Sequence, residues 1–245
     1  FAYAKLGQVV TGIKQLGFYE VVEAALGADM VAYAEAKELA EKGFLTSSCC
    51  PAFVSYVHKQ FPMLSENVSH NMSPMATIAK FIKGMDNEAK TIFIGPCTAK
   101  KGEAQLPGVR EYVDCVMTFE ELQAMLDSRD IELTELEETD LNNASGFGRS
   151  FARCGGLAEA AVEALKEQGI DFEVKPVSCS GIEECRLALL KASKGRAEGN
   201  FIEGMACIGG CINGAGCLTH GERNKNKIDA HSRQAKDKTI VESLH

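Results

Sequence analysis

Residues 201–216 read FIEGMACIGGCINGAG, a short apolar run that passes into a glycine-rich loop with two cysteines. The run predicts a buried strand, and the glycines let the loop backbone approach a bulky group closely. Two other stretches have the same form: TSSCCPAF at 46–53 and GPCTAKKGE at 95–103, which follows the apolar run TIFI. Because sites in α/β proteins gather at the carboxyl ends of strands, we expect the three loops to converge on one buried cofactor.

Four cysteines in these loops suit an iron–sulfur cofactor. Thiolates are the ligands of such clusters, and a cubane takes four of them. The loops supply Cys50, Cys97, Cys207 and Cys211. A single cysteine is most often a small buried hydrophobe, but three cysteine motifs together argue against that interpretation. Lys100 follows Cys97 by three residues and can lie over an anionic ligand in the same pocket.

Helix and strand signals alternate along the chain. Apolar periodicity and capping residues predict helices at 4–17, 29–42, 74–85, 118–126, 157–168 and 180–192, and a surface helix within 221–245. Helix starts are marked by Ser73 before Pro74, Thr118 with Glu121, and Ser180 with Glu183. Strands are expected at 91–95, 113–117, 171–177 and 201–206. The pattern predicts an α/β fold of two lobes, each a largely parallel sheet flanked by helices, with the cluster in the cleft between them.

Bulk composition narrows the function classes. The chain has 245 residues and a formal net charge of -8, which argues against sequence-independent electrostatic binding of nucleic acid. No apolar run approaches the roughly 20 residues of a membrane helix, and no signal peptide opens the sequence. The ten cysteines fall in tight groups rather than a disulfide framework, which indicates reduced thiols and a cytoplasmic location. We treat residues 1–245 as one domain of two lobes, with a boundary near residue 90 unless the lobes interleave.

The three motifs resemble the signatures TSCCP, PCxxKxxE and ExMACxGGCxxGxG of FeFe (iron-only) hydrogenases, in order and over nearly the whole chain. The resemblance implies that the four loop cysteines hold a 4Fe-4S cluster. It implies that Cys211 also bridges to a two-iron subsite with carbon monoxide, cyanide and a dithiolate. By motif position, Cys49 would exchange protons with the dithiolate amine, and Lys100 would bind a cyanide. Met205 and Ser73 would line the subsite.

A proton route is implied in the same way. Glu35 and Glu38 lie three residues apart on an expected helix and so share a face. On the pattern alone, two such carboxylates are usually a solvated helix face. The family uses two glutamates at this spacing and a serine that aligns with Ser69. The resemblance therefore implies a relay in the order Cys49, Glu38, Ser69, Glu35.

Two departures from the family pattern bear on activity. Gly95 stands where the well-known catalytic members have methionine, and Ala52-Phe53 replaces glycine-tryptophan after Cys-Pro. The pattern is therefore more similar to the sensory branch of the family. The ferredoxin-like N-terminal part of many members is absent, and the sequence starts at a helix, so we expect a trimmed core.

We expect reversible H2 oxidation and proton reduction, with slow H2 sensing as a variant of that activity. The partners would be H2, protons, maturation proteins, and ferredoxin or an attached cluster or sensor domain. The alternative is a non-catalytic hydrogenase-like scaffold in cluster assembly. Cys49, Glu35 and Glu38 argue against the scaffold, because it needs no proton relay, and Gly95 favours the sensor.

The remaining cysteines and the histidines carry weaker signals. We interpret Cys115, Cys154, Cys179 and Cys185 as packing residues. Cys217 follows the third motif closely, and a role in a further cluster stays open. The five histidines show no ligand spacing, so surface positions are expected for all of them.

Overall fold

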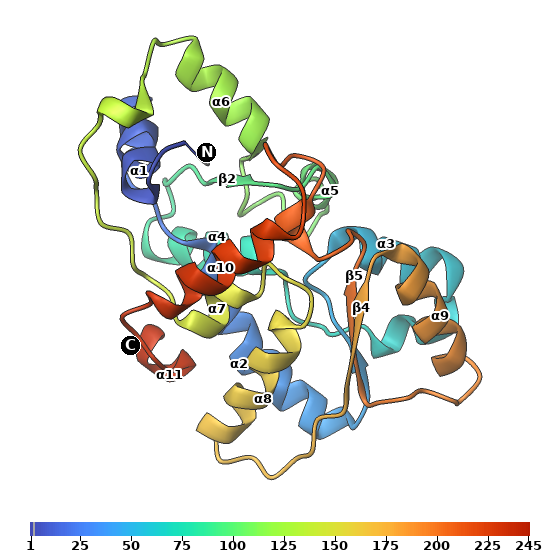
Figure 1. Ribbon diagram of the computed structural model, residues 1–245. Helices are drawn as coiled ribbons and strands as arrows, with labels where there is room; N and C mark the ends of the chain where they lie inside the picture. Colours follow the sequence, from blue (N-terminus) through green and yellow to red (C-terminus); the bar gives the residue numbers. More distant parts are fainter. Residues whose placement is uncertain (2) are drawn as a thin grey trace.

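The computed structural model describes residues 1 and 3–245 and shows an α/β fold with two parallel sheets flanked by helices (Figure 1). Sheet A has the strand order β1-β5-β4, and sheet B pairs β2 with β3. The strands are β1 (Leu45–Thr46), β2 (Ile92–Gly95), β3 (Cys115–Thr118), β4 (Pro176–Ser180) and β5 (Phe201–Met205). Among the described residues, no helix combines the length and the apolarity needed to cross a bilayer.

Eleven α-helices and three 3-10 turns are found in the described residues. The α-helices are α1 (Leu6–Gln15), α2 (Ala24–Lys42), α3 (Pro51–Gln60), α4 (Pro74–Met85), α5 (Ala99–Glu103), α6 (Phe119–Asp127), α7 (Gly146–Ser150), α8 (Gly156–Glu167), α9 (Ile182–Ala192), α10 (Arg223–Arg233) and α11 (Ile240–Ser243). The 3-10 turns are η1 (Pro62–Asn67), η2 (Leu133–Glu135) and η3 (Cys211–Asn213).

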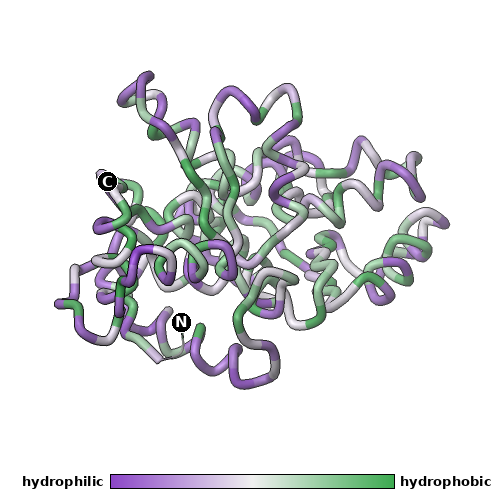
Figure 2. The backbone as a smooth tube through the Cα atoms, turned by 90° about the horizontal axis from the view of Figure 1, so that it is seen from above, coloured by the Kyte–Doolittle hydropathy of each residue, from purple (hydrophilic) through white to green (hydrophobic). Residues whose placement is uncertain are grey.

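Sheet A lies between two helical layers. Neighbouring residues of β5 face opposite sides, as the pleat of a strand requires. Phe201 packs into a core with α2 and α8, while Ile202 packs into a second core with α3 and α9. Both side chains are almost completely buried. Figure 2 shows that hydrophobic stretches run through the interior while the peripheral loops are mostly hydrophilic.

Sheet B has its own helices. Val116 of β3 packs with α4 and α5, and Met117 lies against the core formed by α1 and α6. Sheet A takes β1 from before residue 90 and β4 and β5 from beyond residue 170, while sheet B comes from the chain between them. The two sheets therefore interleave along the sequence, and no single cut near residue 90 separates them.

Small residues bring α2 and α4 close together. Ala32 and Ala36 on α2 are fully buried. A Cβ atom at Gly27 would lie 2.2 Å from the carbonyl oxygen of Pro74, so only glycine fits at that crossing. The helix ends at Gly43, whose φ of 76° is the left-handed conformation favoured by glycine at helix ends. This packing fixes α2, which carries Glu35 and Glu38, against the start of α4.

Local signals predicted two helix starts correctly and one incorrectly. Ser73 caps α4, and Thr118 with Glu121 forms the capping box of α6. The expected box at Ser180 does not form, because the hydroxyl of Ser180 accepts a hydrogen bond from the Gly209 N–H at 2.8 Å instead. The strand expected at 171–177 begins only at residue 176 and continues to residue 180.

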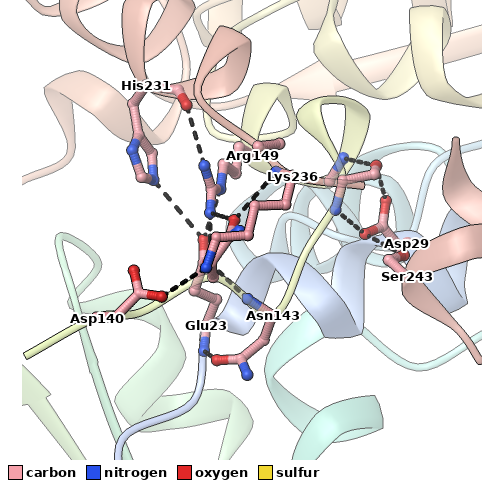
Figure 3. A network of polar contacts seen from close by, with 12 residues as sticks. Glu23, Asp29, Asp140, Asn143, Arg149, His231, Lys236 and Ser243 are labelled. Atoms are coloured by element: carbon pink, nitrogen blue, oxygen red, sulfur yellow. Dashed lines mark hydrogen bonds and ion pairs between the residues drawn. The ribbon is translucent and has the colours of Figure 1, made fainter. Parts of the chain in front are cut away.

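A buried ion pair anchors α10 (Figure 3). Arg149 on α7 donates to the two carboxylate oxygens of Glu23, just before α2, at 2.7 and 2.8 Å. The same guanidinium donates to the carbonyl oxygen of His231 at 3.1 Å, and the His231 ring lies 3.7 Å from Glu23. His231 is therefore not a simple surface residue, contrary to the expectation from sequence. The contacts join the start of α2, α7 and the end of α10.

Candidate iron–sulfur site

The three cysteine loops meet at the carboxyl ends of the strands. The Ser47 N–H donates to the carbonyl oxygen of Ile202 at 2.9 Å, and the Gly204 N–H donates to the Ser47 hydroxyl at 3.1 Å. These bonds tie the first loop to the strand that leads into the third. They follow from the parallel pairing of β1 with β5, which puts both carboxyl ends at the same edge of sheet A.

The second loop, which follows a strand of sheet B, is hydrogen-bonded to both of the others. The Lys100 ammonium donates to the carbonyl oxygen of Cys49 at 3.2 Å and to Glu103 at 2.7 Å. The Gly216 N–H donates to the carbonyl oxygen of Pro96 at 2.9 Å. The convergence expected from the sequence is thus present in the structure.

The other loop thiols act electrostatically on Cys207 and Cys211. Burial raises the pKa of Cys211 to about 12, and the thiols of Cys50, Cys97 and Cys207 add to the shift. The positive charge of Lys100 works in the opposite direction. The pKa of Cys207 is raised by burial and by Cys50 and Cys97. The four side chains therefore share one low-dielectric region from three loops.

The donor set fits a cubane better than a single ion. Within the described part of the chain, no three Cys, His, Asp or Glu side chains are close enough to bind one metal ion. A 4Fe-4S cluster spreads its four thiolate bonds over four iron atoms and so takes cysteines that are set further apart. The loop backbone also fits, because Gly210 has a φ of 98° and a Cβ there would lie 2.7 Å from the Cys154 nitrogen.

The inner end of the expected proton route is fully enclosed. Glu35 is 0% exposed, and neither of its carboxylate oxygens has a hydrogen-bond partner among the described residues. Burial raises the pKa of Glu35 to about 8. Burial, followed by the charge of Glu35, raises the pKa of the Cys49 thiol. Cys49 and Glu35 thus form a buried pair with perturbed proton affinities.

The outer end of the route reaches the surface. The Ser69 hydroxyl donates to Glu38 at 2.9 Å, and the ammonium of Lys42 lies 2.8 Å from the same carboxylate. Burial raises the pKa of Glu38, but hydrogen bonds from Lys42, His70 and Ser69 outweigh it and hold that pKa below its usual value. Glu35 therefore lies inside beside Cys49 and Glu38 lies toward the surface, which is the reverse of the order expected for the two glutamates.

The two residues expected to line the subsite are both buried. Ser73 accepts the Ala76 N–H at 3.4 Å as the cap of α4, so it also has a structural role. Met205 ends β5 and packs in the core with α2 and α8.

Gly95 has a structural partner in Phe93. A Cβ atom at residue 95 would lie 2.6 Å from the Phe93 ring. A larger side chain at this position would require the ring to move. The position of the Phe93 ring therefore depends on the absence of a side chain at Gly95.

Glu203, a fully buried carboxylate in β5, is a further residue of this region that was not singled out from the sequence. It accepts hydrogen bonds from the Gly155 N–H at 2.8 Å, the Ser178 hydroxyl at 3.0 Å and the Ala158 N–H at 3.3 Å. Burial raises its pKa despite these bonds. A charged residue inside the apolar run FIEGM was the available signal. Glu203 holds the segment around residue 155 against sheet A.

The other five cysteines differ in burial. Cys154 is half-buried and packs against the core formed by α2 and α8, in agreement with a packing role. Cys179 and Cys185 are buried in the core with α3, as expected for packing residues. Cys115 is exposed, so the expectation of a core position was wrong for this residue. The Cys217 thiol donates to the carbonyl oxygens of Ile212 at 3.4 Å and Cys211 at 3.7 Å.

Comparison with known proteins agrees with this arrangement. Residues 2–215 match the family model for the C-terminal domain of the "Iron only hydrogenase large subunit". Iron hydrogenase 1 of Clostridium pasteurianum is 30% identical over 272 residues, covering 91% of this chain and 47% of the relative. A cytosolic Fe-S cluster assembly factor, narfl of Xenopus tropicalis, is 24% identical, and the alignment covers 75% of this chain and 49% of the relative. The chain spans about half the length of these relatives.

Solved structures share the fold. The [FeFe]-hydrogenase HydA(deltaEFG) structure aligns with a TM-score of 0.78 at 21% identity, covering 98% of this chain and 82% of that one. A variant of HydA1 from Chlamydomonas reinhardtii aligns with a TM-score of 0.77 at 20% identity and the same coverage.

Proposed function

Because the chain belongs to the family formed by the C-terminal domains of iron-only hydrogenase large subunits, we propose that it binds one 4Fe-4S cluster and supports reversible hydrogen chemistry. The proposed cluster ligands are Cys50, Cys97, Cys207 and Cys211. A two-iron subsite with carbon monoxide, cyanide and a dithiolate, bridged through Cys211, would supply the making and breaking of the H–H bond. Lys100, Met205 and Ser73 would surround that subsite. Ferredoxin or an attached domain would exchange electrons, and maturation proteins would load the site.

The observation that carries the hydrogenase proposal is the graded set of proton-handling groups. Cys49 and Glu35 are enclosed, whereas Glu38 is bonded to Ser69 and reaches Lys42 at the surface. A pKa of about 8 lets Glu35 gain and lose a proton near neutral pH, which is the property that a relay residue needs. We assign the relay order as Cys49, Glu35, Ser69, Glu38.

Each group has a separate task in this relay. Cys49 holds the proton next to the subsite, because its raised pKa keeps the thiol protonated. Glu35 takes up or returns that proton. Ser69 connects the two carboxyl groups: its hydroxyl donates to Glu38, and its nearness to Glu35 lowers the pKa of that carboxyl, against the larger effect of burial. Glu38, with its lowered pKa, exchanges protons with water beside Lys42.

A second candidate function is iron–sulfur cluster assembly without the two-iron subsite. It is favoured by the relatives that are named cluster assembly factors and that cover 75% of this chain. This candidate predicts a cubane but leaves the buried pair of Cys49 and Glu35 without a task. Gly95 favours a slow, sensory form of the hydrogenase over a fast one, because the Phe93 ring leaves no room for a larger side chain at this position.

Two measurements, made one after the other, test the proposal. Reconstituted protein is first compared with Cys97→Ala and with Cys115→Ala, which removes an exposed thiol outside the site. Iron content and the cubane spectrum should be lost in the first variant and kept in the second. After maturation, infrared bands of bound carbon monoxide and cyanide and H2 evolution should appear. A cubane without these bands supports the assembly function, and a Cys97→Ala variant with full iron content refutes the ligand assignment.

A further inference from the structure

The loop that carries Cys207 and Cys211 is held by the segment that follows it. We propose that residues 217–229 form a clamp that positions this loop, with Asn224 as its central positioning residue. The family match ends at residue 215, so the clamp lies beyond the matched stretch. The role of the clamp at the cluster rests on the function proposed above. The effect of the clamp on the position of the loop does not depend on that function.

Asn224 bonds to the loop from outside. Its side-chain amide donates to two oxygens of the loop, the carbonyl oxygen of Ile212 at 2.8 Å and the side-chain oxygen of Asn213 at 3.2 Å. It also donates to the carbonyl oxygen of Thr219 at 2.9 Å, within the clamp itself. The Gly221 N–H donates to the same oxygen of Asn213 at 3.0 Å. Since all these acceptors are oxygens, the orientation of the Asn224 amide is defined by its contacts.

Asn213 extends this contact across the loop. Its own amide nitrogen donates to the carbonyl oxygen of Ile208 at 3.2 Å. Ile208 directly follows Cys207, and Ile212 directly follows Cys211. Asn224 is therefore connected to the backbone next to both proposed ligands, once directly and once through Asn213.

Two further side chains of the clamp reach the same loop. The Cys217 thiol donates to the carbonyl oxygens of Ile212 and Cys211. The Nε2 atom of His220 lies 3.0 Å from the carbonyl oxygen of Gly214 and donates to it. The carbonyl oxygens of Cys211, Ile212 and Gly214 are thus bonded to one short segment.

The opposite side of the loop is held by residues 152–154. The Cys154 N–H donates to the carbonyl oxygen of Gly209, and the Ile212 N–H donates to that of Ala152, each at 3.0 Å. Arg153 pairs with Asp229 on α10 at 2.7 Å. This ion pair joins the two supports, so the ligand loop lies inside a closed ring of contacts.

Apolar packing does not explain the position of α10. None of its residues is buried, and its sequence RNKNKIDAHSR is polar on most sides. Its place beside α7 and η3 (Figure 1) rests on polar contacts. Asn224 is half-buried at the loop, whereas Asn226 on the same helix is exposed. The two asparagines therefore form a matched pair for a test.

The first test uses the cluster-free protein. Asn224→Ala should accelerate hydrogen exchange of the amides at 212–216 by at least about tenfold, because the bonds to Ile212 and Asn213 and the internal bond of the clamp to Thr219 are lost together. Asn224→Asp keeps the shape but removes both donors, and it should act at least as strongly. Asn226→Ala should leave the exchange at its parental rate. Equal rates in Asn224→Ala and Asn226→Ala would overturn the clamp.

The second test uses reconstituted protein. Asn224→Ala should shift the midpoint potential and the electron paramagnetic resonance spectrum of the cubane at unchanged iron content, because the ligand loop is no longer held in one geometry. Asn226→Ala should match the parent in both. Faster loop exchange with an unchanged potential and spectrum would refute a positioning role.

If Asn224→Ala does not fold, His220→Ala takes its place, because it removes a single contact of the clamp with the loop. In His220→Ala the amides at 214–216 should exchange faster than the same amides in Asn226→Ala. Parental exchange there would count against the clamp. Failure of every protein, the parent included, to take up iron would refute the proposed function instead, and the exchange data would still decide on the clamp.

Discussion

At the scale of single residues, the most unusual group is Glu35, a buried carboxyl without hydrogen-bond partners among the described residues. Such a group is costly to ionise, and proteins keep few of them outside functional sites. Its neighbour Cys49 is buried as well. The pair is difficult to explain by stability, and the proposed proton relay would give it a role.

Glu35→Gln removes the titrating group and keeps the size. Matured protein with this change should evolve H2 more slowly by at least about a hundredfold at full cluster content, since proton delivery by a positioned group contributes that much or more. Glu41→Gln, an exposed glutamate on the same helix, is the control. Near-parental H2 evolution by Glu35→Gln would remove Glu35 from the relay.

The same substitution has a consequence for stability that does not depend on any cluster. The pKa of Glu35 is raised from 4.5 to about 8, so the folded state holds a proton that the unfolded chain releases between these values. The parent therefore loses stability as pH rises through this window, by up to about 5 kcal/mol. Glu35→Gln lacks this loss. Its free energy of unfolding, measured by denaturant at pH 5 and pH 8, should fall less than that of the parent or of Glu41→Gln.

The order of the two glutamates illustrates what a sequence leaves open at this scale. Spacing placed Glu35 and Glu38 on one helix face, which the structure confirms. Spacing says nothing about which end of that face points inward. The answer comes from α4, which packs on α2 through Gly27 and Pro74, and from the Ser69 and His70 contacts of Glu38.

At the scale of elements, capping residues predicted a helix start correctly where the hydrogen-bond partner of the cap lies in the same helix. The caps at Ser73 and Thr118 bond within their own helices and were predictable. Ser180 has the same pattern but bonds to Gly209, which is distant in sequence. No local rule reveals such a competitor. The placement of α10 could not be predicted either, because it depends on Arg149, Arg153 and Asn224 contacts.

The buried pair of Arg149 and Glu23 makes a prediction for α7 and α10. Arg149→Met should lower the free energy of unfolding by about 3–5 kcal/mol, because it leaves the Glu23 carboxylate buried without its main partner. Arg196→Met, at an exposed arginine, should change it by less than about 0.5 kcal/mol. Denaturant unfolding measures both. A double variant, Arg149→Met with Glu23→Met, should recover most of the loss, and a loss equal to that of the single variant would contradict this account.

At the scale of the whole molecule, the proposed cluster site lies where two interleaved sheets meet. The motifs predicted that three loops converge, and the structure confirms it. The pairing of β1 with β5 rather than with β4 was not predictable, because Leu45–Thr46 is too short to show a pattern. The proposed cluster would connect both sheets through covalent bonds.

Cluster loading should therefore depend on pH. Burial keeps the thiols of Cys207 and Cys211 protonated, with the pKa of Cys211 raised to about 12, and metal binding needs their thiolates. Loading must then release protons, and its equilibrium should become more favourable as pH rises from 7 to 9. Calorimetry in buffers of different ionisation enthalpy measures the release. Loading without proton release would mean that these thiols are not the ligands.

The strand order of sheet A also bears on how the site arises during synthesis. β1 has β5 as its partner, so Cys50 leaves the ribosome long before the strand that places Cys207 and Cys211. At roughly 5–20 residues per second, this interval lasts on the order of ten seconds or more. Until then a nascent chain offers reactive thiols but no complete binding site. Insertion of the proposed cubane would therefore wait until the chain has been made at least as far as Cys211, and until then the early cysteines would stay reduced only in reducing surroundings.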